Sequence, residues 1–530
     1  MELPLTPLAL VERGVLAFPD RTAVVGDRFS WTYAELSSRL CRLAGAMATL
    51  GIGAGERVAL LAPNTAQAFE CYSGVPLSGA VLVPLNTRLS ADEYAYILDH
   101  SESRALVVDA SLLDAVEPAL AALARPLHVV VQGSVVPPPG TLGYDDLLDG
   151  APAVPLASEA VDERATITLN YTSGTTARPK GVAVSHRGAC LNAVNMVLAM
   201  RLVREDVHLH VAPMFHANGW GFVWATLAVG AANVPLPRVT GAGVLDRVER
   251  FGVSHLCAAP TVLRMILRDA ARRSGPVRST VRLATAGGPP SAATLRQIEE
   301  LLGWRVTHLY GLTETTAFAT YCEEPLALAA MPLEARARFK ARQGIPLLLS
   351  GKVRVERPDG EEVRPDALEM GEVAVRGNVV MSGYHRDPDA TALALRGGWL
   401  RTGDLAVRHP DGYIELRDRL KDVIKSGGEQ IPSIEVEATL IGHPAVAEAA
   451  VVAAPDPDWG ETPAAFVVLK QGAGATAEDL RAYCRERLTH FKVPTLYVFV
   501  DDLPRTASGK VRKTVLRQGL VQGGEGIGRA

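Results

Sequence analysis

The chain has 530 residues, of which 48% are hydrophobic, and its formal net charge is −4 at pH 7. This length allows several domains' worth of buried core, and the small negative charge excludes the generally basic surface that binds nucleic acid. The six cysteines lie far apart and form no CxxC pair. That spacing argues against a zinc site or a disulfide framework and favours a reducing, cytoplasmic compartment.

No membrane segment is expected. The first residues, "MELPLTPLALVERGV", lack the basic region and the cleavage pattern of a signal peptide. The stretch from Val211 to Pro237 lies within the longest run without Asp, Glu, Lys or Arg. Pro213, His216, Asn218 and Asn233 interrupt it, and each would cost free energy in hydrocarbon. We interpret this stretch as protein interior or pocket wall.

From residue 57 onward, short apolar runs alternate with longer segments that resemble helices. In chain order, strands are expected at 57–63, 80–86, 104–110 and 127–133, and helices at 65–78 and 91–100. The proline-rich 134–140 is expected to be a surface connection. This alternation predicts βα units and a largely parallel sheet.

Residues 165–171, "ATITLNY", alternate strictly between apolar and polar side chains, which predicts a strand. The local composition changes near residue 418, and a second series of helices and strands is expected after it. It contains a helix after Pro432, a strand at 447–455, a helix from Thr476 with Asp479 in a capping box, and a strand at 495–500. The fold class predicted is α/β, with a large domain at 1–418 and a small α+β domain at 419–530.

The strand at 165–171 runs into "YTSGTTARPKGV", which is suited to polyphosphate. Gly174 permits close approach of the backbone, Lys180 supplies a cation, and hydroxyl donors come from Thr172, Ser173, Thr175 and Thr176. A Walker A loop is excluded because Pro179 precedes the lysine and Gly181 follows it, where that motif needs a glycine and a hydroxyl residue. A solvated turn remains the alternative for this loop considered alone.

Further segments decide between these readings. The loop resembles the phosphate loop of the adenylate-forming superfamily, which includes acyl-CoA synthetases, nonribosomal adenylation domains and beetle luciferases. "TAGGPPS", "YGLTET", "RTGDLA", "RDRLKDVIKSGGEQ" and "LPRTASGKVRK" resemble further motifs of that family and occur in the family's order. The resemblance covers nearly the whole chain and implies a large domain followed by a mobile small one.

The resemblance implies roles for individual residues. It places Gly287, Gly288, Pro289 and Tyr310 at the adenine, Gly311 among the ATP-binding residues and Thr313 at the α-phosphate. Asp404 and Arg419 would bind the ribose, Glu314 would bind Mg²⁺, and Lys510 would be the adenylation lysine. Lys421 would be the hinge, and Ser426, Gly427 and Gly428 would line the route of CoA; a simple β-turn is the alternative and explains Ser426 equally well.

The segment "PMFHANGWGF" at 213–222 resembles the family's acyl-pocket segment. His216 would lie beside the substrate carboxylate and Trp220 would wall or gate the cavity, while ordinary core packing is the alternative for both. The residues of these motifs are most similar to those of the family branch that activates medium-chain, branched, aromatic or methylthio-substituted acids. Since no Arg or Lys occurs between Val211 and Pro237 to pair with a second carboxylate, an apolar monocarboxylic acid is favoured.

The predicted function is an ATP-, Mg²⁺- and CoA-dependent acid–thiol ligase that acts through an acyl-adenylate. One alternative is a stand-alone enzyme that loads an acyl group onto a carrier-protein phosphopantetheine. Another is a catalytically silent nucleotide-binding protein on the same fold. The sequence leaves open the acid, the pathway, the domain orientation and the oligomeric state, including a homodimer.

Overall fold

The computed structural model describes residues 3–134, 136–159, 161–172, 178–273, 275, 277, 280–505 and 511–522. Contacts between residues divide the chain into two units, one of Met1–Val353 with Val375–Leu400 and the other of Arg354–Ala374 with Arg401–Ala530. The first unit combines sheets with helices and the second is smaller, so the predicted fold class is confirmed. The boundary expected between residues 418 and 419 stays a prediction.

One sheet of the first unit has nine strands within the described ranges, in the order β16-β15-β14-β13-β12-β10-β11-β1-β2. Neighbours from β1 to β14 along this order pair in parallel. The strands are β1 (Thr22–Val25), β2 (Ser30–Thr32), β10 (Val207–His210), β11 (Ala232–Pro235), β12 (His255–Ala258), β13 (Arg282–Thr285), β14 (Arg305–Tyr310), β15 (Thr320–Tyr321) and β16 (Ile345–Pro346).

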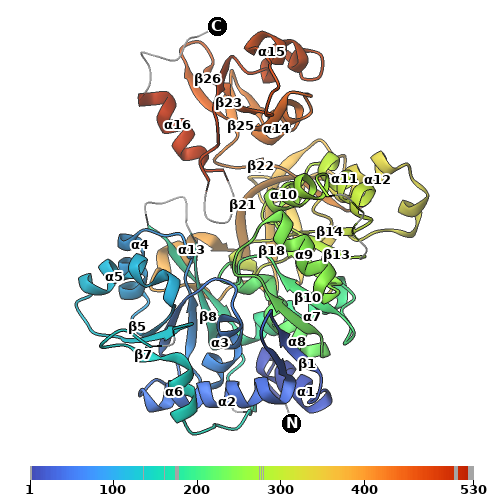
Figure 1. Ribbon diagram of the computed structural model, residues 1–530. Coiled ribbons are helices and arrows are strands. Elements are labelled where there is room, and N and C mark those ends of the chain that lie inside the picture. The colour runs from blue at the N-terminus through green and yellow to red at the C-terminus, as the bar shows by residue number, and fades with distance from the viewer. Residues whose placement is uncertain are drawn as a thin grey trace. The chain divides into compact units, whose positions relative to one another are not determined.

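A second sheet has eight strands in the described part of the chain, in the order β19-β9-β8-β4-β3-β5-β6-β7. Figure 1 shows its blue and teal strands apart from the green strands of the first sheet. The strands are β3 (Arg57–Leu61), β4 (Val81–Pro84), β5 (Ser103–Asp109), β6 (His128–Gln132), β7 (Leu142–Gly143), β8 (Thr166–Thr172), β9 (Lys180–Ser185) and β19 (Gly383–Tyr384).

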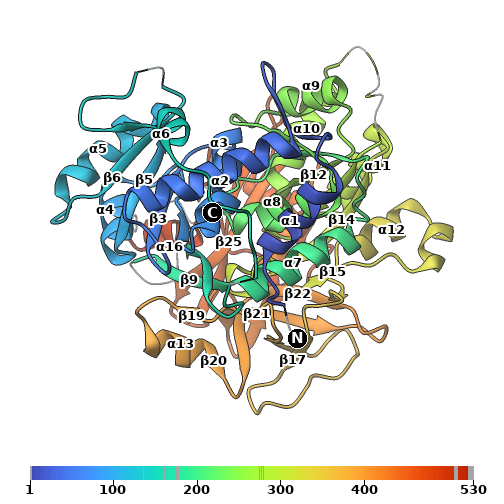
Figure 2. The ribbon, with the colours of Figure 1, turned by 90° about the horizontal axis from the view of Figure 1, so that it is seen from below.

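Helices cover both faces of these sheets, because each sheet presents apolar side chains on both sides. Figure 2 shows α2, α3 and α8 running between the two sheets. Apolar residues of α4 and α5 pack on the eight-stranded sheet, and those of α9, α10 and α11 pack on the nine-stranded sheet. The helices of this unit are α1 (Pro7–Ala17), α2 (Tyr33–Thr49), α3 (Ala66–Leu77), α4 (Ala91–His100), α5 (Leu113–Ala122), α6 (Tyr144–Gly150), α7 (His186–Ala199), α8 (Phe222–Val229), α9 (Gly241–Phe251), α10 (Pro260–Ala270), α11 (Ala292–Leu302), α12 (Leu333–Lys340) and α13 (Pro388–Ala394).

Two further sheets follow, each with five strands among the described residues. The first contains β17 (Lys352–Glu356), β18 (Met370–Arg376), β20 (Leu395–Arg396), β21 (Trp399–Arg408) and β22 (Ile414–Arg419). The second contains β23 (Ile424–Ser426), β24 (Glu429–Ile431), β25 (Val446–Asp456), β26 (Gly460–Leu469) and β27 (Leu496–Phe499). Helices α14 (Ser433–Ile441) and α15 (Ala477–Arg485) pack on it and share one apolar core, and α16 (Lys513–Gln522) ends the described chain.

Several expected elements are present. Helix α4 has the expected bounds, and Thr476 and Asp479 form the predicted capping box of α15. Strand β8 differs from the expectation in one respect, because its polar side chains Thr168 and Asn170 are as deeply buried as its apolar ones. A central strand covered by helices on both faces buries both sets of side chains, whatever their polarity.

Candidate active site

The predicted phosphate loop joins two antiparallel strands. The last residue of β8, Thr172, pairs with the first residue of β9, Lys180. The loop therefore closes a hairpin, whereas a Walker A loop leads from a strand into a helix. Of the predicted phosphate ligands, Ser173, Gly174, Thr175 and Thr176 lie outside the described residues.

Tyr384 connects the loop's lysine to the predicted magnesium ligand. Its hydroxyl donates a hydrogen bond of 2.8 Å to Oε1 of Glu314. The Nζ atom of Lys180 lies 5.0 Å from the centre of the Tyr384 ring, within cation–π distance. Burial, followed by the nearby Glu314 carboxylate, raises the pKa of Tyr384, so the phenol stays protonated and donates. A cation and a carboxylate are thus held at one tyrosine.

Three predicted segments follow parallel strands of the nine-stranded sheet, two of them neighbours (β13 and β14) and the third (β10) separated from β13 by β12. Strand β10 precedes the expected acyl-pocket segment, β13 precedes Gly287, Gly288 and Pro289, and β14 ends at Tyr310. The carboxyl ends of parallel strands meet at one edge of a sheet, where open α/β sheets bind their ligands. Tyr310 and Thr313 are both buried at this edge, and Gly311 has no room for a side chain because its Cβ would lie 2.2 Å from the Ala317 carbonyl oxygen.

The expected acyl-pocket segment contains a left-handed turn. Five consecutive residues, Ala217 to Gly221, have φ angles of 44°, 56°, 54°, 62° and 83°. Each non-glycine residue in this conformation costs about 1–2 kcal/mol, so the surrounding structure must hold the turn in place. Four of these residues form the turn η2 (Asn218–Gly221), and α8 begins directly after it.

Trp220 is buried and lies close to Phe318 and to one other predicted segment. Its ring lies 5.5 Å from that of Phe318, at an interplanar angle of 75°. A Cβ atom placed on Gly287 would lie 4.0 Å from Trp220 Cζ2. The structure therefore brings Trp220 next to the predicted adenine loop. His216 is half-buried, and its backbone N–H donates to the Pro213 carbonyl at 3.0 Å.

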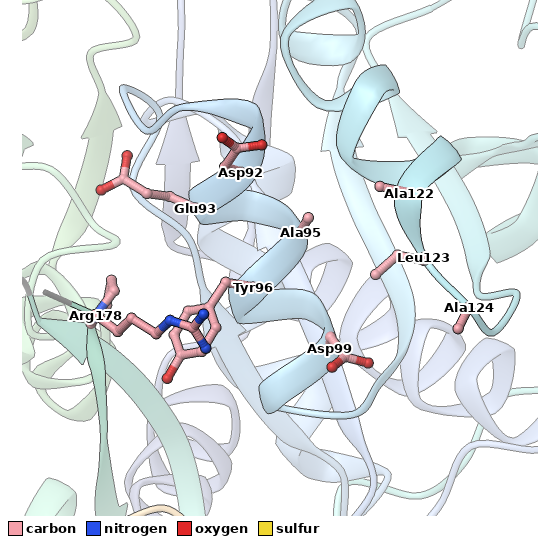
Figure 3. Close-up of a pocket in the computed structure, with 10 residues that line it drawn as sticks. Asp92, Glu93, Ala95, Tyr96, Asp99, Ala122, Leu123, Ala124 and Arg178 are labelled. Atoms are coloured by element: carbon pink, nitrogen blue, oxygen red, sulfur yellow. The ribbon is translucent and has the colours of Figure 1, made fainter.

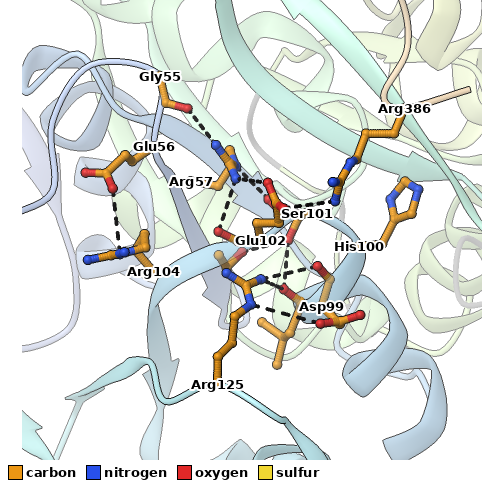
Figure 4. A network of polar contacts seen from close by, with 12 residues as sticks. Gly55, Glu56, Arg57, Asp99, His100, Ser101, Glu102, Arg104, Arg125 and Arg386 are labelled. Carbon is orange, nitrogen blue, oxygen red and sulfur yellow. Dashed lines mark hydrogen bonds and ion pairs between the residues drawn. The ribbon is translucent and has the colours of Figure 1, made fainter. Parts of the chain in front are cut away.

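The chain that carries Tyr384 is fastened to the eight-stranded sheet by charges (Figure 4). Glu102 pairs with Arg386 at 3.1 Å and with Arg57 at 2.7 Å. The Arg57 guanidinium also donates to the backbone carbonyl of Ser101 at 2.6 Å. These contacts fix residue 386, two positions after Tyr384, relative to β3 and β5.

A cavity of about 510 Å³ lies on the outer side of α4 (Figure 3). It is lined by α4, by the chain around the end of α5, and by Arg178 and Pro179. Arg178 lies over the Tyr96 ring at 5.2 Å, which ties the arm of the phosphate loop to α4. None of the side chains predicted to bind ATP or the acid lines this cavity, and we assign it no ligand.

In the second unit, the two residues expected at the ribose form a cross-strand pair. Asp404 on β21 lies opposite Arg419 on β22, and the carboxylate is 3.1 Å from the guanidinium Nε. Asp404 is buried, whereas Arg419 is partly exposed. Lys421, the expected hinge, follows two residues after Arg419.

The expected CoA-route residues form the turn of a hairpin. Ser426 at the end of β23 pairs with Glu429 at the start of β24, which leaves a two-residue turn. Gly427 and Gly428 have φ angles of 57° and 89°, which such turns require and glycine adopts without strain. The turn itself accounts for both glycines, and their place on the route of CoA stays a prediction. Lys510 lies outside the described residues.

Tyr384 and Phe318 belong to none of the motifs that the sequence singled out. Tyr384 lies in "SGYHRD", where nothing in the local pattern points to Glu314, seventy residues earlier in the chain. Phe318 follows the "YGLTET" motif closely and could have been suspected from that position. For Tyr384, only the pairing of β19 with β9 brings the side chain to Lys180.

Comparison with known proteins identifies the family. The model of the AMP-binding enzymes matches residues 11–385, and that of the AMP-binding enzyme C-terminal domain matches residues 435–510. The chain belongs to the AMP-binding enzyme family, as the sequence predicted. Its relatives are named CoA ligases, so the predicted class of enzyme, an acid–thiol ligase, is confirmed.

One relative is the 2-methylpropanoate–CoA ligase of Humulus lupulus, with 41% identity over 97% of this chain and 95% of that protein. Another is the peroxisomal butyrate–CoA ligase of Arabidopsis thaliana, with 39% identity over 97% and 93%. Among solved structures, an anthranilate CoA ligase in complex with anthranoyl-AMP has a TM-score of 0.88 and 27% identity, over 99% of each chain. These similarities support the use of ATP and CoA.

In the described ranges, no helix has both the length and the apolar character needed to cross a membrane. The expected cytoplasmic location stays a prediction, since one of these relatives is named as peroxisomal.

Proposed function

We propose that this protein is a ligase that joins an apolar monocarboxylic acid to CoA with the consumption of ATP, through an acyl-adenylate. The observation that carries this proposal is the arrangement of Lys180, Tyr384 and Glu314. It holds a cation and a carboxylate beside the start of β9, the strand that follows the hydroxyl-rich loop. This combination suits a magnesium-bound polyphosphate.

The first half-reaction joins acid and nucleotide. A carboxylate oxygen of the acid attacks the α-phosphorus of ATP, the bond from that phosphorus to pyrophosphate breaks, and the acyl-adenylate forms. Negative charge accumulates on the phosphoryl oxygens, so cations and oriented donors stabilise the transition state. We assign the β- and γ-phosphates to Lys180 and to the loop residues from Thr172 to Thr176, the α-phosphate to Thr313, and the reacting oxygens to Lys510.

Glu314 suits a magnesium ion shared with the phosphates. The described residues contain no group of three or more His, Cys, Asp or Glu side chains that could form a metal cage by themselves. Mg²⁺ is commonly bound by one or two carboxylates together with substrate phosphates, and Glu314 offers one oriented carboxylate. The ion would neutralise phosphate charge, while Tyr384 holds the carboxylate in place.

We assign the adenosine and CoA contacts residue by residue. Gly287, Gly288, Pro289, Tyr310 and Gly311 are assigned to the adenine, and the Asp404–Arg419 pair to the ribose. In the second half-reaction, the thiolate of CoA attacks the acyl carbonyl and AMP leaves. We assign Lys421 to the hinge of this step, and Ser426, Gly427 and Gly428 to the pantetheine route.

The acid is a short or medium-chain, branched or aromatic monocarboxylate. No cationic residue lies between Val211 and Pro237, and Trp220 presents an apolar wall beside Phe318. The relatives named for 2-methylpropanoate and butyrate, and the structure with anthranoyl-AMP, support this range of acids. We assign His216 to the substrate carboxylate.

The test is acid-dependent exchange of labelled pyrophosphate into ATP over a panel of monocarboxylic acids, followed by transfer to CoA. We expect exchange and CoA-dependent release of AMP with at least one short, branched or aromatic acid. Lys510→Ala should lower exchange by about 10²–10³-fold while ATP binding survives, because a stabilising cation is lost. Absence of exchange with every acid would contradict the proposal. Transfer to carrier proteins but not to free CoA would establish the carrier-loading alternative.

A further inference from the structure

Three buried polar side chains form a closed ring beneath the expected acyl-pocket segment. Thr168 Oγ1 donates to Asn170 Oδ1 at 2.8 Å, Asn170 Nδ2 donates to Asn218 Oδ1 at 3.0 Å, and Asn218 Nδ2 donates to Thr168 Oγ1 at 2.9 Å. All three residues are at most 2% exposed. Two of them lie on β8, which carries the phosphate loop, and the third lies in the left-handed turn.

The ring is one of several contacts that hold this turn in its unfavourable conformation. Asn64, buried after β3, donates to the carbonyls of His210 and Ala212 and accepts from the N–H of Met214. The Met214 carbonyl in turn accepts from the N–H of Gly219 at 2.8 Å. Backbone strain that the surroundings maintain in this way marks functional sites.

Trp220 is the residue through which the ring acts. It stands two positions after Asn218, within the same left-handed run, and its carbonyl accepts from Asn192 Nδ2 at 3.4 Å. The turn aims the indole at Phe318 and at Gly287. A residue at position 218 in an ordinary helical or extended conformation would send the following chain, and with it the indole, in another direction.

The ring fixes an orientation as well as filling space. An apolar trio of similar size could fill the same space, because buried polar groups add stability only when every partner is satisfied. What a directional ring adds is a fixed orientation. Asn is also one of the few residues apart from glycine that tolerates the left-handed region, so position 218 combines that tolerance with an amide that reaches β8.

We propose that the ring of Thr168, Asn170 and Asn218 positions Trp220 as a rigid wall and thereby sets how strongly the enzyme discriminates between carboxylic acids of different length and shape. The inference rests on the proposed function, since it concerns the acid that the ligase activates. The three ring residues are positioning residues, and Trp220 is the residue that contacts the acid.

The experiment compares the wild type with Thr168→Val, which keeps the shape of the side chain and removes the hydroxyl. Pyrophosphate exchange is measured with 2-methylpropanoate, butyrate, octanoate and benzoate. We expect the ratio of kcat/KM between the best and the worst acid to fall about fivefold or more, because a wall that moves no longer rejects the wrong acid. The KM for ATP should stay within about twofold of the wild type, since no ring residue is among those assigned to ATP.

Two controls separate positioning from stability. Thr168→Ser restores the hydroxyl and should restore the wild-type ratio. Thr226→Val breaks another fully buried Thr–Asn bond, the 2.7 Å bond from Thr226 Oγ1 to Asn233 Oδ1, and should lower the melting temperature without changing the ratio. If Thr168→Val does not fold, Asn218→Gly replaces it, because glycine keeps the left-handed backbone and removes the amide.

If the wild type is active and a folded ring variant keeps the same ratio of kcat/KM between the best and the worst acid, the inference is overturned and the proposed function stands. An equal change in Thr226→Val, or a KM for ATP that rises in parallel with that of the acid, also overturns it. A wild type that shows no exchange with any acid overturns the proposed function instead, and this inference falls with it. A lower ratio in Thr168→Val that Thr168→Ser restores supports the inference.

Discussion

At the scale of single residues, Tyr384 joins groups that the sequence keeps far apart. Lys180 and Glu314 belong to separate motifs, and each was predicted from its own segment. Tyr384 touches both, through its ring on one side and its hydroxyl on the other. The partners that hydrogen-bond to a metal-binding carboxylate fix its orientation, and losing one typically costs 10–100-fold in metal affinity or activity.

Tyr384→Phe should therefore weaken the response to magnesium. We expect the Mg²⁺ concentration for half-maximal pyrophosphate exchange to rise about tenfold, because Glu314 loses the donor that orients it. Tyr94→Phe is the matched control. It removes a hydroxyl that donates to the Asn86 carbonyl at 2.9 Å and has no contact with Glu314, so only stability should fall, by about 1 kcal/mol. An unchanged magnesium requirement in Tyr384→Phe would contradict the role given to Tyr384.

At the scale of elements, contacts with the surrounding structure hold the turn at Ala217 to Gly221 in a left-handed backbone conformation. Gly221 ends the turn with a φ of 83°, and a Cβ there would lie 2.3 Å from Asn192 Nδ2. The left-handed backbone favours glycine at this position, and an added Cβ would force the Asn192 amide to move. Helix α8 begins at the next residue, so the turn also sets where that helix starts.

Gly221→Ala should be more harmful than an alanine at an unobstructed left-handed glycine. We expect a loss of at least about 2 kcal/mol in the free energy of unfolding, from backbone strain together with the clash, and a lower kcat/KM for the acid. Gly252 ends α9 with a φ of 64° and has no atom within 4 Å of its Cβ position. Gly252→Ala should cost about 1 kcal/mol and leave the kinetics unchanged. Equal losses measured by urea unfolding would show that the clash has no consequence.

At the scale of the whole molecule, histidines buried in the first unit link stability to pH. Burial lowers the pKa of His186, His210 and His308 from 6.5 to about 4. The unfolded chain therefore binds a proton at each position below pH 6.5, while the folded chain does not until about pH 4. The stability that each neutral imidazole contributes is fully present above pH 6.5 and is lost as the pH falls towards 4.

His210→Gln tests this linkage at one site. His210 Nε2 lies 2.9 Å from Asn233 Oδ1, and a glutamine amide can still donate there. Between pH 6.5 and 4, we expect the wild type to lose about 2–3 kcal/mol more stability than the variant, because a shift of one pKa unit corresponds to about 1.4 kcal/mol. Urea unfolding over this pH range measures the difference. Parallel curves would show that His210 is not the source of the acid sensitivity.

The sequence by itself determined many of the helices and strands and the family. Short apolar runs between helix-like segments predicted β3 and α4, strict alternation predicted β8, a capping box predicted α15, and ordered motifs predicted the family. These features depend on residues close together in the chain, so each can be recognised from the sequence without knowledge of the fold. The exclusion of a Walker A loop likewise needed only the residues on either side of Lys180.

Only the tertiary structure decided which distant residues meet. Tyr384 reaches Glu314 because β19 pairs with β9, and Asn218 closes its ring with Thr168 and Asn170 because the left-handed turn lies against β8. No sequence period encodes such contacts, since they arise when separate elements pack on one another and their free energy comes from the whole core. The two glycines after Ser426 show the same limit, because the hairpin register explains them without any ligand.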